Sequence, residues 1–193
     1  MRVLVACERF GVIRDAFIKA GHDAMSCDLV DTLAPGPHYA GDVRDILHDG
    51  WDLMIAHPPC TFLCSSGLHW NTRRPERAAQ TDEAVEFVRR LLAAPIPRIA
   101  VENPIGCLST RIRKPDQIVQ PWQFGEDASK ATCFWLVGLP FLEATNIIKK
   151  DRYANQTASG QNKLPPSPDR WKERSRTYEG IAAAMASQWG CLK

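Results

Sequence analysis

The sequence predicts an α/β domain in which short strands alternate with helices around a mostly parallel sheet. Two observations lead to this prediction. Short apolar and β-branched runs end at a charged residue or a proline, and the segments between several of them have the apolar spacing of helices. A chain of 193 residues has the length of one domain, so we expect residues 1–193 to form a single unit.

The first half of the chain begins with a strand, a helix and a second strand. The apolar run from Val3 to Ala6 is expected to be a buried strand. A helix follows over residues 12–21, which places Ile13, Phe17 and Ile18 on one face and ends at a glycine. Residues 22–30 contain the next strand, which ends near Asp28.

The rest of the chain repeats this alternation. Asp42 is expected in a short strand or turn, and the proline pair at 58–59 ends a strand that begins near residue 51. The apolar stripe of residues 76–94 predicts a helix. The remaining expected elements are a strand within 96–104, a strand within 131–141, a polar loop over 149–174 and a helix from Thr177.

Residues that directly follow the predicted strands are the candidates for a functional site. In open parallel sheets, ligands bind outside the carboxyl ends of the strands. A thiol and several carboxylates are therefore expected at one edge. These residues are Cys7, Glu8, Asp28, Asp42, His57, Pro58, Pro59, Cys60, Glu102, Asn103 and Pro104.

Cys60 and Glu102 offer the most specific chemistry at this edge. A thiol acts as a nucleophile in its thiolate form, and a carboxyl group can donate or accept a proton. Two other interpretations of Cys60 stay open from the residues alone. It could be a buried structural thiol, or it could bind zinc together with His57, Cys64 and His69, although a second tight ligand pair is missing.

Composition excludes several classes of protein. The seven cysteines are scattered and odd in number, which does not fit a disulfide scaffold. No apolar segment approaches the ~20 residues that cross a bilayer, so we expect no membrane association and a reduced, cytoplasmic protein. The formal net charge of +2 leaves room for a local basic patch.

The motifs HPPC at residues 57–60 and VENP at residues 101–104 resemble the catalytic motifs of cytosine-5 DNA methyltransferases. The resemblance implies a Rossmann-like methyltransferase fold with S-adenosylmethionine as the methyl donor. It implies that the Cys60 thiolate adds to carbon 6 of cytosine and that Glu102 holds and protonates nitrogen 3. Asn103 would position the loop, and carbon 5 would then accept the methyl group.

The same resemblance covers the cofactor side. It implies a glycine turn after the first strand, represented here by Gly11 alone, and an acidic residue, Asp28, that holds the ribose hydroxyls. Asp42 matches an aspartate near the adenine, and a turn or cap role for it stays open. Cys7, Glu8 and Pro58 complete the expected cofactor site, and no metal is expected.

The chain departs from the family in ways that bear on its substrate. Thr61 and Pro104 replace the usual glutamine and valine, residues 117–125 contain no arginine, and no length remains for a separate target-recognition domain. The chain resembles small phage or prophage members, which implies DNA or a cytosine nucleotide as the substrate. The expected substrate contacts are Pro59, Arg73, Arg74, Arg111 and Arg113.

Two other functions stay open from the sequence, as does the oligomeric state. One is a non-catalytic descendant of the fold that binds nucleic acid or protein. The other is a different pyrimidine-modifying enzyme that uses the same cysteine without this cofactor.

Overall fold

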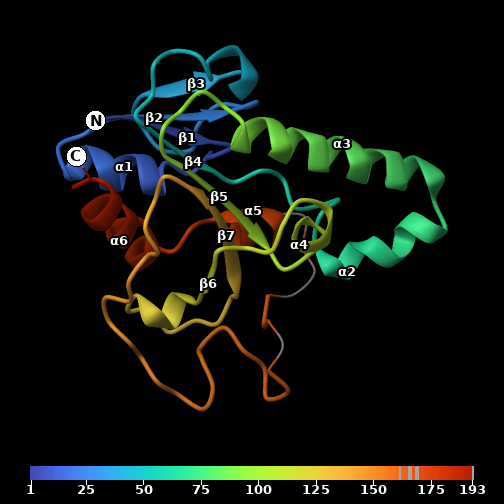
Figure 1. Cartoon of the computed structure of the whole chain (residues 1–193). Helices are drawn as coiled ribbons and strands as arrows, with labels where there is room; N and C mark the ends of the chain where they lie inside the picture. Colours follow the sequence, from blue (N-terminus) through green and yellow to red (C-terminus); the bar gives the residue numbers. More distant parts are fainter. Residues whose placement is uncertain (161, 165–166, 168–169, 193) are drawn as a thin grey trace.

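The computed structural model describes residues 1–160, 162–164, 167 and 170–192, and it contains one seven-stranded sheet in the order β3-β2-β1-β4-β5-β7-β6 (Figure 1). β1 pairs in parallel with β2 and β4, and β4 pairs in parallel with β5. β7 runs antiparallel to both β5 and β6. The strands are β1 (Arg2–Ala6), β2 (Asp23–Asp28), β3 (His38–Ala40), β4 (Leu53–Ala56), β5 (Ile99–Pro104), β6 (Gln117–Val119) and β7 (Thr132–Val137).

Helices cover both faces of this sheet. In Figure 1, α1 and α6 lie together on one face and α3 lies on the other. The α-helices are α1 (Val12–Lys19), α2 (Ser65–Leu68), α3 (Pro75–Leu92), α4 (Leu108–Arg111), α5 (Arg170–Ser175) and α6 (Glu179–Trp189). Three single turns of 3₁₀-helix are η1 (Val43–Asp45), η2 (His69–Thr72) and η3 (Pro121–Gln123).

The central strands are apolar throughout because both of their faces are buried. In β1, Val3 and Val5 pack with the α1 and α6 side of the core. Leu4 and Ala6 point the other way and pack with the α3 side. This double burial explains why the strands read as short apolar runs rather than alternating ones.

The turn between β1 and α1 is held by buried polar contacts. Gly11 has φ +70°, which favours glycine, and a Cβ there would overlap the guanidinium of Arg14. Glu8 is buried and accepts hydrogen bonds from the backbone N–H groups of Ile13 (2.7 Å) and Arg14 (3.3 Å). The carboxylate of Glu8 therefore caps the N-terminus of α1.

Most of the predicted elements are present, and the differences lie outside the central strands. The predicted loop over 149–174 contains the start of α5, and β6 was not predicted. Ile18 does not share the buried face of Ile13 and Phe17, because its side chain is 41% exposed. Asp42 follows β3 and caps η1, because its side chain accepts a hydrogen bond from the N–H of Arg44. It therefore lies in a turn, which was one of the two predicted positions. Among the described residues, no helix combines the length and apolar character needed to span a membrane.

Candidate active site

The carboxyl ends of β1, β2, β4 and β5 meet at one edge of the sheet, as predicted. Three neighbouring cavities open there, with volumes of about 420, 250 and 20 Å³. We call them the large cavity, the cysteine cavity and the glutamate cavity. Cys60 lines the cysteine cavity, Glu102 lines the glutamate cavity, and Asp28 lines both the large cavity and the cysteine cavity.

Cys60 lies in a tight loop that is attached to β5. Its carbonyl oxygen accepts hydrogen bonds from the N–H groups of Leu63 and Cys64, both at 3.0 Å. The side-chain amide of the buried Asn103 donates to the carbonyl of Pro58 at 2.8 Å. Gly106 packs so closely on the loop that a Cβ there would overlap the carbonyl oxygen of Leu63. Asn103 and Gly106 together hold the Cys60 loop against β5.

Glu102 pairs with His57 across the two strand ends. The Nδ1 atom of His57 lies 2.9 Å from Oε2 of Glu102. Burial opposes ionisation of Glu102, but the hydrogen bond and charge of His57, with the charge of Lys130, outweigh it and hold the pKa of Glu102 below its ordinary value. Because an ionised carboxylate only accepts, Nδ1 of His57 carries the shared proton.

The thiol of Cys60 is protonated at neutral pH. Burial raises the pKa of Cys60, and the neighbouring Cys64 and Glu102 raise it further, against smaller opposing effects of Arg174 and Lys130. The surroundings of the two groups therefore favour a thiol at Cys60 and a carboxylate at Glu102.

The raised pKa of Cys60 predicts slow alkylation at neutral pH. The reaction of Cys60 with iodoacetamide should accelerate roughly tenfold per pH unit from pH 7 to 9, because only the thiolate reacts and its fraction rises below the pKa. Mass spectrometry of the peptide containing Cys60 separates this reaction from that of the exposed Cys191. A rate that is already constant at pH 7 would show a low thiol pKa and contradict this prediction.

The cysteine cavity and the glutamate cavity share one wall. His57, Ser175 and Thr177 line both of them. Ser175 ends α5, and Thr177 lies in the connection to α6. Cys60 and Glu102 are thus brought to adjacent hollows at one edge of the sheet, with the 175–177 segment across them.

Lys130 is a site residue that the sequence analysis missed. It lines the glutamate cavity, its ammonium group lies 5.9 Å from the ring centre of Tyr178, and it donates to the carbonyl of Arg174 at 2.6 Å. Lys130 precedes β7, whereas the residues predicted at this edge follow strands. Because β7 is antiparallel, its amino end lies beside the carboxyl end of β5. Lys130 could be placed at this edge only if the antiparallel direction of β7 were known.

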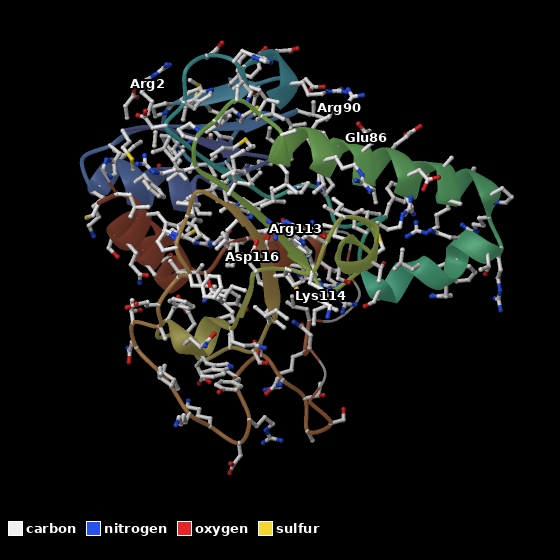
Figure 2. All side chains as sticks on the ribbon, viewed as in Figure 1. Arg2, Glu86, Arg90, Arg113, Lys114 and Asp116 are labelled. Carbon is white, nitrogen blue, oxygen red and sulfur yellow. The ribbon has the colours of Figure 1, made fainter. Side chains whose placement is uncertain are left out.

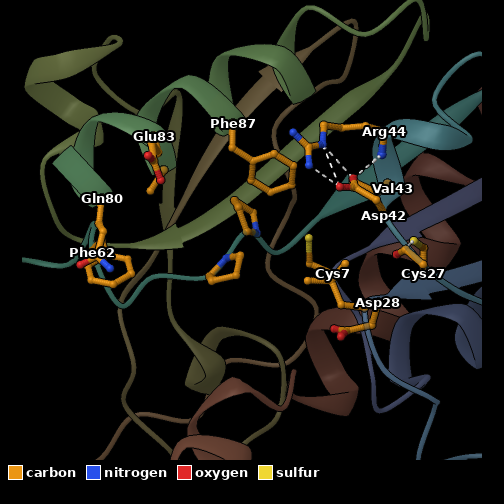
Figure 3. A pocket seen from close by; sticks show the side chains of 15 residues that line it. Cys7, Cys27, Asp28, Asp42, Val43, Arg44, Phe62, Gln80, Glu83 and Phe87 are labelled. Atoms are coloured by element: carbon orange, nitrogen blue, oxygen red, sulfur yellow. Dashed lines mark hydrogen bonds and ion pairs between the residues drawn. The ribbon is translucent and has the colours of Figure 1, made fainter. Parts of the chain in front are cut away.

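The large cavity has the character of a small-molecule site (Figure 3). Its volume of about 420 Å³ lies in the range of ligand pockets. Asp28 and Asp42 place carboxylates in it, and the aromatic rings of Phe62 and Phe87 line it. Asp42 is also ion-paired with Arg44, and the hydrogen bonds from Arg44 keep the pKa of Asp42 below its ordinary value.

The other residues expected at the cofactor site have different positions. Pro58 and Pro59 line the large cavity, and Cys7 lies between the large cavity and the cysteine cavity, with a positive φ of 58°. Glu8 also borders the cysteine cavity, but both of its carboxylate oxygens are bonded to α1. Gly11 shapes the turn and lines none of the three cavities.

The arginines expected to contact substrate fall into two groups. Arg111 is ion-paired with Asp82 at 2.7 Å. Arg113 is ion-paired with Asp116 at 2.6 Å, and both of these residues are labelled in Figure 2. Arg113 also donates to the carbonyl of Leu136, and neither of these arginines lines the three cavities. The guanidinium groups of Arg73 and Arg74 instead lie near an exposed tryptophan, Trp70.

The side chains considered for zinc do not form a ligand set. Among the described residues, no group of three or more His, Cys, Asp or Glu side chains is arranged to hold a metal ion. Cys64 lies 3.3 Å from the hydroxyl of Ser66, at the start of α2.

Comparison with known proteins finds no matching family model and no matching curated sequence. Solved structures similar to this chain include a prophage-encoded E. coli protein assigned as a DNA modification methyltransferase (TM-score 0.45, 16% identity). They also include a mutant of DNMT2 from Spodoptera frugiperda (TM-score 0.44, 15% identity). The aligned regions cover 70% and 77% of this chain but only 46% and 54% of those chains. The chain thus spans about half the length of each.

The predicted fold class is confirmed. The chain has an α/β Rossmann-like fold, with a mostly parallel sheet flanked by helices and an antiparallel β7 inserted beside β5.

Proposed function

We propose that this chain transfers a methyl group from S-adenosylmethionine to carbon 5 of a cytosine through a covalent adduct with Cys60. One observation carries the proposal. The loop of Cys60 is bonded to the strand of Glu102 through Asn103, at the edge where a cavity of about 420 Å³ also opens. A thiol, a carboxyl group and a cavity of the size of a small-molecule site thus lie at the same edge of the sheet, which supports the proposal.

The proton on Cys60 has a defined destination in this reaction. As the sulfur bonds to carbon 6, the thiol proton has to leave, and nitrogen 3 of the ring has to gain one. Glu102 is ionised at rest and lines the cavity next to that of Cys60, so in this mechanism it takes up that proton and holds it at nitrogen 3. Carbon 5 then becomes the nucleophile.

The final steps restore the enzyme. S-adenosylmethionine, when bound, supplies an electrophilic methyl group to carbon 5. The proton on carbon 5 then leaves to a base, the bond between sulfur and carbon 6 breaks, and the proton at nitrogen 3 returns to the Cys60–Glu102 pair. Asn103 acts as a positioning residue, because its amide bonds the backbone of the Cys60 loop and not the ring.

The residues of the large cavity fit the cofactor. Asp28 can accept hydrogen bonds from the ribose hydroxyls at the end of β2, and Phe87, Val43 and Ala84 offer apolar surface to the adenine. Asp28 and Cys7 also line the cysteine cavity, so the two cavities adjoin, as transfer of a methyl group between them requires.

Calorimetric titration with S-adenosylmethionine tests this proposal. We expect measurable binding, weakened about tenfold or more by Asp28→Ala, since two charge-assisted hydrogen bonds are lost. Asp23→Ala is the matched control, because Asp23 lies at the opposite end of the same strand and should leave the affinity unchanged. The absence of binding at millimolar cofactor would refute the proposal and favour a non-catalytic member of the fold.

A further inference from the structure

A short projecting segment links the Cys60 loop to α3. We call residues 65–77 the arm: it comprises α2, η2 and the first residues of α3. In Figure 1 the arm and the N-terminal part of α3 extend well beyond the edge of the sheet. None of the site chemistry described above uses it.

The tip of the arm combines an exposed indole with two guanidinium groups. Trp70 is 39% exposed, although a large apolar side chain is usually more stable when buried. The guanidinium carbons of Arg73 and Arg74 lie 5.7 and 5.1 Å from the centre of its ring. The ring centres of His69 and Trp70 lie 4.9 Å apart. A partly exposed indole and two positive charges over its ring are therefore presented together.

The arm carries an uncompensated positive charge. Residues 65–77 contain three arginines, Arg73, Arg74 and Arg77, and one carboxylate, Glu76. Within the part of the chain that the structure describes, neither Arg73 nor Arg74 is paired with a carboxylate, in contrast to Arg111 and Arg113. Two free guanidinium groups beside an aromatic ring suit phosphates next to a stacked base.

The arm is also bonded to the loop of Cys60. Arg77 donates to the carbonyl of Thr61 at 2.7 Å and to that of Gly67 at 3.3 Å. The hydroxyl of Thr81 donates to the carbonyl of Phe62 at 3.0 Å and accepts from the amide of Asn71 at 2.9 Å. A ligand held on the arm is therefore held in a defined position relative to the nucleophile.

We propose that the substrate is an unpaired polynucleotide strand, and that the arm binds the nucleotides next to the target cytosine. A flanking base stacks on Trp70, and its phosphates contact Arg73 and Arg74. This inference rests on the proposed function for the identity of the target base. The binding of a strand by the arm does not depend on the proposed function.

Two physical reasons favour a single strand over the alternatives. In a duplex the faces of each base are covered by its neighbours, so an exposed indole finds a base face only in an unpaired strand. Trp70, Arg73 and Arg74 lie outside the cavity of Cys60, so a free cytosine nucleotide bound in that cavity would leave them unused. An unpaired strand also avoids the cost of flipping a base out of a duplex.

Binding to a labelled cytosine-containing single-stranded DNA, measured by fluorescence anisotropy at low salt, tests this inference. We expect it to bind at least about tenfold more tightly than the same sequence as a duplex. Trp70→Ala should weaken single-strand binding roughly 5- to 100-fold, the usual effect of losing one base stack. Trp70→Phe should recover most of the affinity, and Arg73→Ala should lower the salt dependence of binding by about 0.7 in log–log slope.

The control variant removes the same charge elsewhere. Arg90→Ala lies at the other end of α3, where Arg90 is paired with Glu86 (Figure 2), and should leave binding unchanged. Single-stranded RNA of the same sequence shows whether the sugar matters, since base faces and phosphates are common to both. Stronger binding to the duplex, or an unchanged affinity of Trp70→Ala, would overturn the inference.

The outcomes separate this inference from the proposed function. Strand binding that depends on Trp70 in a protein without methyl transfer would refute the proposed function and leave the arm's role intact. Methyl transfer to duplex DNA that is insensitive to Trp70→Ala would support the proposed function and refute the role of the arm. The arm does not line the large cavity, so binding of S-adenosylmethionine reports whether the Trp70→Ala variant is folded.

Discussion

Cys60→Ser is expected to lower methyl transfer about a thousandfold or more, the scale on which covalent catalysis is lost with its nucleophile. The reason lies in the adduct: without sulfur bonded to carbon 6, carbon 5 of cytosine is not electron-rich enough to accept the methyl group. A serine hydroxyl has a far higher pKa than a thiol and no strong base beside it. Transfer of a tritiated methyl group from S-adenosylmethionine to DNA measures the effect.

The cofactor affinity of Cys60→Ser separates a chemical effect from a folding effect. Cys60 lines the cysteine cavity and not the large cavity, so binding of S-adenosylmethionine should be retained. Cys64→Ser is the matched control, because Cys64 is on the same loop, at the start of α2, and should keep most of the activity. Full methyl transfer by Cys60→Ser would remove Cys60 from the mechanism.

Glu102→Gln is expected to lower methyl transfer about a hundredfold or more, the usual contribution of a positioned proton donor. Glutamine can still accept the hydrogen bond from His57, so the local geometry is kept. It cannot take up the proton that leaves Cys60, so nitrogen 3 stays unprotonated. The same transfer assay detects the loss.

Glu102→Gln should also change the alkylation rate of Cys60, and in the opposite direction to the rate of methyl transfer. The carboxylate of Glu102 raises the pKa of Cys60, so its removal should lower that pKa and speed alkylation of Cys60 at a given pH. Faster alkylation together with slower methyl transfer distinguishes a lost proton donor from a collapsed site. Glu86→Gln, on the exposed face of α3, should change neither rate (Figure 2). Slower alkylation would contradict this assignment.

The fold could be predicted where the local signal was strong. The apolar runs of β1 and β4 are buried on both faces and end at charged residues or proline, so their positions were clear. The three-residue β6 was missed because three residues carry no periodicity. The antiparallel direction of β7 depends on pairing between distant segments, which no local pattern records.

The site shows the same division. Residues that follow parallel strands, such as Asp28 and Cys60, could be placed at one edge from the sequence. Lys130 could not, because its position depends on the direction of β7. The pairing of His57 with Glu102 joins residues 45 positions apart, and it emerges only once β4 and β5 are known to be neighbours. The exposure of Trp70 could not be predicted either, because it depends on how the arm packs in three dimensions.

The most direct test of the central claim is capture of the covalent adduct. An oligonucleotide with 5-fluorocytosine, offered single-stranded and as a duplex, blocks the last step because fluorine cannot leave carbon 5 as a proton does. The proposed mechanism predicts a denaturation-resistant adduct that forms only with S-adenosylmethionine and maps by mass spectrometry to Cys60. An adduct on another cysteine, an adduct formed equally without the cofactor, or formation of 5-methylcytosine from ordinary DNA with no adduct would contradict it.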